Sequence, residues 1–117
     1  YAIADAQPTR VRAWVHVNPN HTAHALAEIV RGVARGAIGI KLSASRRADD
    51  PLLDPVMEAA REHGLPVLHH IWQHRRREWG GQEASDGVEL GRLAARHPEV
   101  KFLLAHIGGG GDWAHTN

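Results

Sequence analysis

The chain contains no cysteine, and this one absence removes several kinds of chemistry. It excludes disulfide bonds, zinc sites built from thiolates and cysteine nucleophiles, and it fits a protein of the reducing cytoplasm. The sequence also lacks any apolar run near the roughly 18 residues that a membrane-spanning helix requires. We therefore expect a cytoplasmic protein with no membrane partner.

An excess of charge of one sign is lacking as well, because the formal net charge at neutral pH is +1. The basic residues are mostly arginines, with Lys41 and Lys101 as the two lysines. The arginines are scattered along the chain among aspartates and glutamates. No long-range field therefore attracts a polyanion, and we expect no nucleic-acid partner.

Hydrophobic residues and histidines are well represented. Hydrophobic residues make up 43% of the 117 positions, which suits the core of one small folded domain. Ten residues are histidines, whose imidazole titrates near neutral pH and binds divalent metals. Their positions along the chain decide whether any of them can meet.

Short apolar runs alternate with helical patterns along the chain. The strand patterns span residues 11–17, 37–42, 65–70 and 100–106, and the helical patterns span residues 23–35, 51–63 and 83–97. We expect Thr22 to cap the first helix and Asp50 with Pro51 to open the second. Gly36 and Gly64 follow these two helices and are expected to end them.

The resulting order, β-α-β-α-β-α-β, predicts an α/β fold with parallel strands and right-handed crossovers. Four such units are half of an eight-stranded barrel, and an isolated four-stranded sheet would leave backbone groups unpaired at its edges. We therefore expect parallel βα units forming about half of a (β/α)8 TIM-type barrel. Residues 1–117 would be a single partial domain, a fragment of a longer barrel.

Two of the expected strands end in histidine. The run Gly64–His70 ends in His69 and His70, and the run Val100–Gly111 contains His106 followed by glycines. The carboxyl ends of parallel strands open on one face, where the chemistry of such proteins takes place. Two imidazoles at that face would be the start of a metal or acid–base site.

Three segments carry a resemblance to a known family. Gly39–Leu42, Asp50–His70 and Leu93–Gly109, in this order and spacing, resemble the amidohydrolase-related (amidohydrolase 2) family. The resemblance spans residues 36–111. It implies a metal-dependent (β/α)8 barrel from a superfamily that also contains non-oxidative decarboxylases of the aminocarboxymuconate-semialdehyde and resorcylate types.

The resemblance also implies roles for the strand-end histidines. The strand-five histidine of the family binds a divalent metal, and the Pro-Val-x-x-His spacing places it at His70. Strand alternation agrees, because His69 takes the opposite face and is expected to be structural. His106 matches the strand-six histidine, which polarises or protonates the substrate or binds a second metal. We expect zinc, with manganese as an alternative.

Other signatures of the family have no match in the sequence. The family's opening His-x-His pair is missing, since the segment His16–Asn18 does not fit it, and its strand-eight aspartate would lie beyond Asn117. We therefore expect this segment alone to be inactive.

Two basic residues are candidate substrate contacts. Lys41 could bind a substrate carboxylate or simply extend its ammonium group to solvent, and Ser43 lies on the same face. Arg75 belongs to a run of three arginines near Trp72 that could bind an anionic substrate or form a solvated loop.

The sequence thus favours a metal-dependent hydrolase of a small carbonyl compound, such as a lactone or amide, with His70 as metal ligand and His106 as acid/base. A metal-dependent decarboxylase of a small aromatic or unsaturated acid is the close alternative. A different class also stays open: a non-catalytic module binding a phosphorylated ligand at Gly108–Gly111, or a degenerate half-barrel pairing with a second copy as a homo-oligomer.

Overall fold

The computed structural model describes residues 1–72 and 84–108 of the chain. Its four strands form one parallel sheet in the order β1-β2-β3-β4: β1 (Val15–Val17), β2 (Ile40–Leu42), β3 (Val67–His69) and β4 (Phe102–Leu104). Its α-helices are α1 (Ala2–Ala6), α2 (Thr22–Ala34), α3 (Asp54–Glu62) and α4 (Gly87–Arg96), and its 3-10 helices are η1 (Pro19–His21), η2 (Pro51–Leu53) and η3 (Ala105–Gly108).

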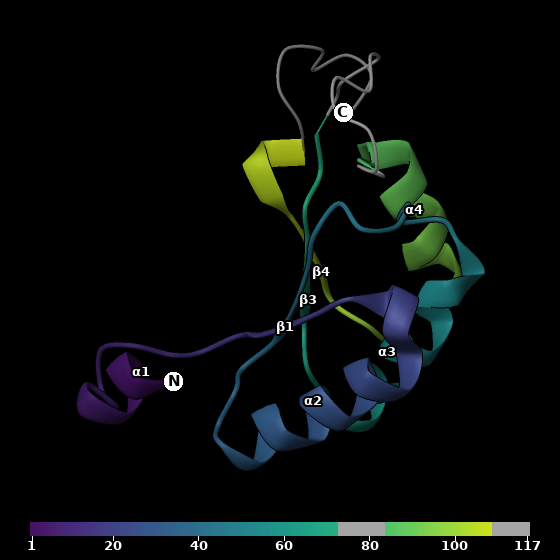
Figure 1. The fold of residues 1–117 in the computed structure, drawn as a ribbon. Coiled ribbons are helices and arrows are strands. Elements are labelled where there is room, and N and C mark those ends of the chain that lie inside the picture. Colours follow the sequence, from purple (N-terminus) through teal and green to yellow (C-terminus); the bar gives the residue numbers. More distant parts are fainter. Residues whose placement is uncertain (73–83, 109–117) are drawn as a thin grey trace.

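The strands follow one another across the sheet, and the crossover helices α2, α3 and α4 lie along one side of it (Figure 1). An unbroken strand order with all crossovers on one side is the arrangement of a (β/α)8 barrel, in which helices surround the sheet. The predicted fold class, parallel βα units forming about half of such a barrel, is therefore confirmed.

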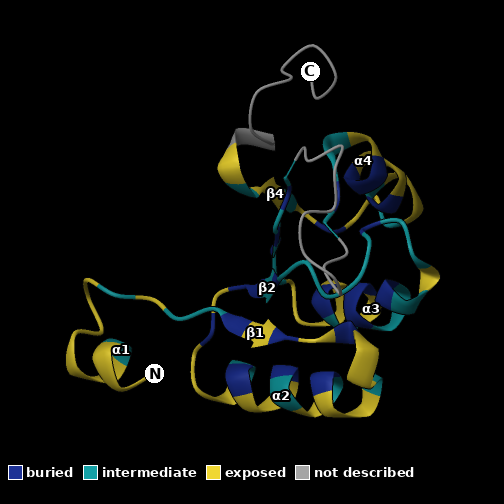
Figure 2. Ribbon diagram, turned by 45° about the horizontal axis from the view of Figure 1, so that its top comes forward, coloured by how far each residue is buried: buried dark blue, intermediate teal, exposed yellow. Residues whose placement is uncertain are grey.

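The two faces of the sheet differ in burial, as alternation along a strand requires. One face packs against the helices and carries the buried side chains Val15, Val17, Ile40, Leu42, Val67 and His69. The other face carries His16, Lys41, Leu68 and Leu103, which lie opposite one another in register. Figure 2 shows the buried residues concentrated where the helices meet the sheet. In a closed barrel, this second face lines the interior.

Several predicted element boundaries needed correction. Each hydrogen-bonded strand is three residues long, so the apolar runs extend beyond the paired segments. Thr22 begins α2 rather than capping it, and its hydroxyl donates to the carbonyl of Pro19. The helix expected from residue 83 begins at Gly87, where Asp86 and Glu89 form a capping box. Helix α1 was not predicted.

The other predicted start and stop signals are confirmed. The Asp50 carboxylate accepts a hydrogen bond from the Leu52 amide at 2.8 Å, which caps η2 immediately before α3. Gly36 and Gly64 adopt left-handed φ values of 79° and 63° at the ends of α2 and α3. Glycine reaches this conformation without the steric cost that a Cβ imposes.

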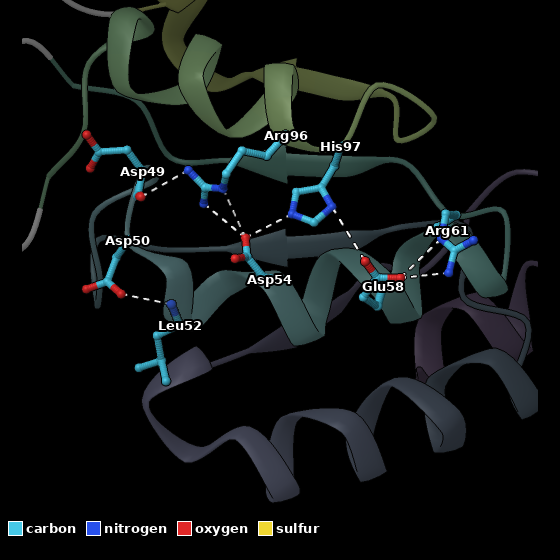
Figure 3. Close-up of polar contacts among 8 residues, drawn as sticks. All are labelled: Asp49, Asp50, Leu52, Asp54, Glu58, Arg61, Arg96 and His97. Carbon is cyan, nitrogen blue, oxygen red and sulfur yellow. Dashed lines mark hydrogen bonds and ion pairs between the residues drawn. The ribbon is translucent and has the colours of Figure 1, made fainter.

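A polar network joins the start of α3 to the end of α4 (Figure 3). Asp54 accepts hydrogen bonds from His97 at 2.9 Å and from Arg96 at 3.0 Å. The second ring nitrogen of His97 lies 3.9 Å from a carboxylate oxygen of Glu58. The network fixes the helix that precedes β3 against the helix that precedes β4. Among the described helices, none combines the length and apolarity needed to cross a membrane.

Candidate functional site

His70 and His106 meet where β3 and β4 end. The Nδ1 atom of His70 lies 3.2 Å from the Nε2 atom of His106, and the two rings pack edge to face with centroids 4.8 Å apart. The strands are paired in parallel, with Val67 opposite Phe102, so their carboxyl ends lie side by side. The structure therefore brings together the two histidines that the sequence singled out.

His106 is held in an unusual backbone conformation. It lies in η3, two residues beyond the end of β4, and has a φ of 56°. It is the one non-glycine residue with positive φ among those the structure describes. Such a residue costs on the order of 1–3 kcal/mol, and residues of this kind concentrate at functional sites. The prediction placed His106 at the end of a continuous strand, and the observed turn corrects this detail.

Trp72 completes the histidine pair as a third ring. Its centroid lies 5.1 Å from that of His106, edge to face, and 6.5 Å from that of His70, with the planes nearly parallel. From the sequence, Trp72 was interpreted only as a neighbour of the arginine run. Trp72 follows His70 by two residues, and alternate residues of an extended segment share a face. This spacing could have predicted that Trp72 lies on the same face as His70.

The electrostatics of the site favour a neutral His70. Burial lowers the pKa of His70, and the nearby charges of His106 and Lys41 lower it further. A neutral imidazole has a nitrogen lone pair that can bind a metal or accept a proton, whereas an imidazolium has no such lone pair.

His69 lies on the other side of the sheet, in agreement with strand alternation. It is 1% exposed, and burial is the main cause that lowers its pKa to about 4. Its Nδ1 atom lies 2.9 Å from the carbonyl oxygen of His70, and its Nε2 atom has no hydrogen-bond partner among the described residues. His69 is therefore part of the core beneath His70 and is directed away from His106.

Lys41 lies next to the histidine pair. Its Nζ atom donates to the carbonyl oxygen of Leu42 at 2.6 Å, and the same oxygen accepts the backbone N–H of His70 at 2.9 Å. Burial lowers the pKa of Lys41. On the same face, the Oγ atom of Ser43 lies 2.8 Å from the Nε2 atom of His16, a contact that the sequence analysis missed.

Two further sequence candidates are Arg75 and the glycine run Gly108–Gly111. Arg75 and the glycines from Gly109 onward lie outside the described residues.

His70 fits part of a metal site, because the nitrogen of a neutral imidazole is a common zinc ligand. His106 lies beside this nitrogen, at 3.2 Å, where it can transfer a proton. No group of three or more His, Cys, Asp or Glu side chains suited to a metal occurs among residues 1–72 and 84–108. The described residues thus supply imidazole donors but not a full set of ligands.

Comparisons with known proteins agree with the fold. A model of the amidohydrolase family matches residues 1–116, and the chain therefore belongs to this family. No curated protein matches the chain by sequence. Among solved structures, it is similar to the 5-carboxyvanillate decarboxylase LigW from Sphingomonas paucimobilis, with a TM-score of 0.67 and 25% identity. The similarity covers 92% of this chain and 38% of that chain, so this chain spans well under half of the decarboxylase.

Proposed function

We propose that the chain carries part of the active site of a metal-dependent hydrolase that acts on a small carbonyl compound of the lactone or amide type. The observation that carries this proposal is the 3.2 Å approach of His70 and His106 at the carboxyl ends of two paired strands. Membership of the amidohydrolase family supports it. A chain without cysteine suits the cytoplasm, where we place a small-molecule substrate.

In this proposal the described residues have distinct tasks. His70 offers the lone pair of a neutral imidazole as a ligand, and His106 accepts or returns a proton at its Nε2 atom. When bound, a divalent ion, zinc or alternatively manganese, supplies Lewis-acid polarisation of the substrate carbonyl and acidifies water. Trp72 covers one side of the two imidazoles and limits the access of bulk water. Lys41 and Arg75 are the proposed substrate contacts.

Decarboxylation of a small aromatic or unsaturated acid is a second candidate. The observation that favours it is the similarity to a structure described as a 5-carboxyvanillate decarboxylase. In that reaction, His106 would give its proton to the carbon that loses carbon dioxide. The same strand-end histidines serve both reactions.

The deciding experiment incubates the full-length protein, loaded with zinc or manganese, with a panel of lactones, amides and hydroxybenzoates. Released acid and released carbon dioxide are measured separately, and a chelator control removes the metal. Hydrolysis that stops on chelation supports the proposed hydrolase. Release of carbon dioxide without hydrolysis overturns it in favour of the decarboxylase, and turnover that ignores the chelator overturns both.

A further inference from the structure

We propose that Lys41 and Ser43 form a carboxylate-binding subsite beside the histidine pair, and that His16 positions the Ser43 hydroxyl within it. The inference rests on the proposed function, since it describes the substrate of that same centre. That substrate would carry a carboxylate in addition to the group that reacts at His70 and His106.

The first argument is the uncompensated charge of Lys41. Among the described residues, carboxylates pair with the guanidinium groups of Arg31, Arg35, Arg46, Arg47, Arg61, Arg92 and Arg96. Lys41 has no acidic partner in this part of the chain, although it is partly buried and burial lowers its pKa. Burial removes part of the water that stabilises the charge of an ammonium group. An anion bound beside it stabilises that charge instead, so a partly buried ammonium without a counter-ion favours anion binding.

The second argument is the position of this ammonium. The carbonyl oxygen of Leu42 accepts hydrogen bonds from both the ammonium group of Lys41 and the backbone N–H of His70. An ammonium has three N–H donors, so two remain after this bond. Lys41 occupies the middle of β2 on the face that also carries Leu68 and Leu103. An anion held there lies on the same open face as the histidine pair and next to it.

The third argument is the second donor that Ser43 provides. Ser43 follows Lys41 by two residues, and its Oγ atom lies 2.8 Å from the Nε2 atom of His16. His16 pairs with Lys41 in the register of β1 and β2, which brings this imidazole to the carboxyl end of β2. When Nε2 carries the proton, it donates to Oγ and leaves the Ser43 hydroxyl hydrogen free to donate elsewhere.

Together, Lys41 and Ser43 offer an ammonium and a hydroxyl donor on one face. A carboxylate accepts through two oxygens and forms its strongest hydrogen bonds with charged donors, so it matches this pair. A nucleophilic Ser–His dyad is the other chemistry that such a contact suggests. It requires a third group to orient the imidazole, and no carboxylate contacts His16 among the described residues. His16 therefore acts as a positioning residue.

The test uses benzoate as the probe and benzamide as its uncharged isostere, with binding to the full-length protein measured by calorimetry. We expect Lys41→Met to weaken benzoate binding by about 10- to 100-fold, and Ser43→Ala by about 3- to 10-fold. Lys41→Met should weaken benzamide binding much less than benzoate binding, whereas Ser43→Ala should weaken both, because the amide oxygen also accepts a hydrogen bond from a hydroxyl. Lys101→Met is the matched control, because Lys101 is the other lysine, is exposed and precedes β4 at its amino end.

Two further variants guard against a merely structural effect. Lys41→Arg keeps the charge and should retain most of the benzoate affinity. His16→Leu should weaken benzoate binding in the wild-type background and have no further effect in the Ser43→Ala background, because His16 acts through that hydroxyl. An equal loss in both backgrounds would overturn the positioning role of His16.

The outcomes separate this inference from the proposed function. If both the wild type and Lys41→Met take up metal and bind benzoate equally, the subsite is overturned and the proposed metal centre still stands. Protein that takes up no metal but loses benzoate affinity in Lys41→Met supports the subsite and overturns the metal-dependent function.

Discussion

The Nδ1 atom of His70 lies 3.2 Å from the Nε2 atom of His106, although 36 positions separate the two residues in the chain. Parallel pairing of β3 with β4 explains this distance, because it places the ends of both strands at one edge of the sheet. His70 directly follows β3, and His106 lies in the turn η3 that directly follows β4. The fold itself therefore assembles the pair.

Replacing His106 should affect turnover without affecting metal uptake. In the metal-loaded protein, we expect His106→Asn to lower kcat by about 100- to 10,000-fold, the usual contribution of general acid–base catalysis. Steady-state kinetics together with metal analysis of the same sample provide the measurement. A normal kcat, or a loss of bound metal that parallels the loss of kcat, would contradict the acid–base role.

The helix-facing side of the sheet should dominate stability. Ile40 is completely buried in β2, whereas Ile38, two residues earlier and outside the strand, is 42% exposed. We expect Ile40→Ala to lower the free energy of unfolding by about 2–5 kcal/mol, because it leaves a cavity between the sheet and the helices. Ile38→Ala is the matched control and should cost less than about 1 kcal/mol. Urea unfolding measures both, and equal losses would refute the assignment of Ile40 to the core between the sheet and the helices.

Gly39 should tolerate no side chain. A Cβ atom placed there would lie 2.2 Å from the ring of Trp14, whereas one at Gly91 in α4 would meet nothing within 4 Å. We expect Gly39→Ala to lower the free energy of unfolding by about 1–3 kcal/mol through overpacking. Gly91→Ala should raise it by about 0.5–1 kcal/mol, because alanine favours a helix interior. Thermal or urea unfolding of the two variants tests the contrast, and a Gly39→Ala variant at least as stable as the wild type would contradict it.

The network between α3 and α4 should make stability depend on acid pH. Burial acts to raise the pKa of Asp54, but hydrogen bonds from His97 and Arg96 outweigh it and hold this pKa below its usual value. A carboxylate with a lowered folded-state pKa stabilises the fold fully above its unfolded pKa of about 3.9 and loses this contribution as the pH falls through the folded value. The difference in unfolding free energy between wild type and Asp54→Asn should therefore shrink between pH 6 and pH 3.

The control for this prediction is Asp5→Asn. Asp5 pairs with Arg35 at the surface, where such an ion pair contributes at most about 1 kcal/mol. Urea unfolding at pH 6 and pH 3 gives both differences. A constant difference for Asp54→Asn across this range would show that His97 and Arg96 do not hold its carboxylate.

The order of the elements and the proximity of the two histidines could be predicted from the sequence, because both follow from local patterns of apolar residues. Apolar runs and helical stripes alternate strongly enough to identify parallel βα units, and in such a sheet all strand ends share one face. Alternation along β3 was also sufficient to separate His69 from His70, since successive side chains point to opposite faces. These features depend on local periodicity alone.

Other parts of the site depend on register, which local patterns do not encode. The contact between His16 and Ser43 spans 27 positions and exists because His16 pairs with Lys41 across two strands. The turn at His106 arises from a left-handed backbone that no periodicity signals. Helix α1 has five residues, none of them buried, so it carries no amphipathic stripe. The capping box of Asp86 was readable as an Asp-x-x-Glu pattern, but the prediction missed it because it started the helix at residue 83, four residues before Gly87.

The most direct test of the central proposal is the metal content of three full-length proteins: wild type, His70→Leu and His69→Leu. Both substitutions remove an imidazole from adjacent positions, but only His70 lies against His106 on the open face of the sheet. We expect the wild type and His69→Leu to retain a bound divalent ion after gel filtration, and His70→Leu to lose it. Metal retained by His70→Leu and lost from His69→Leu would contradict the proposed centre.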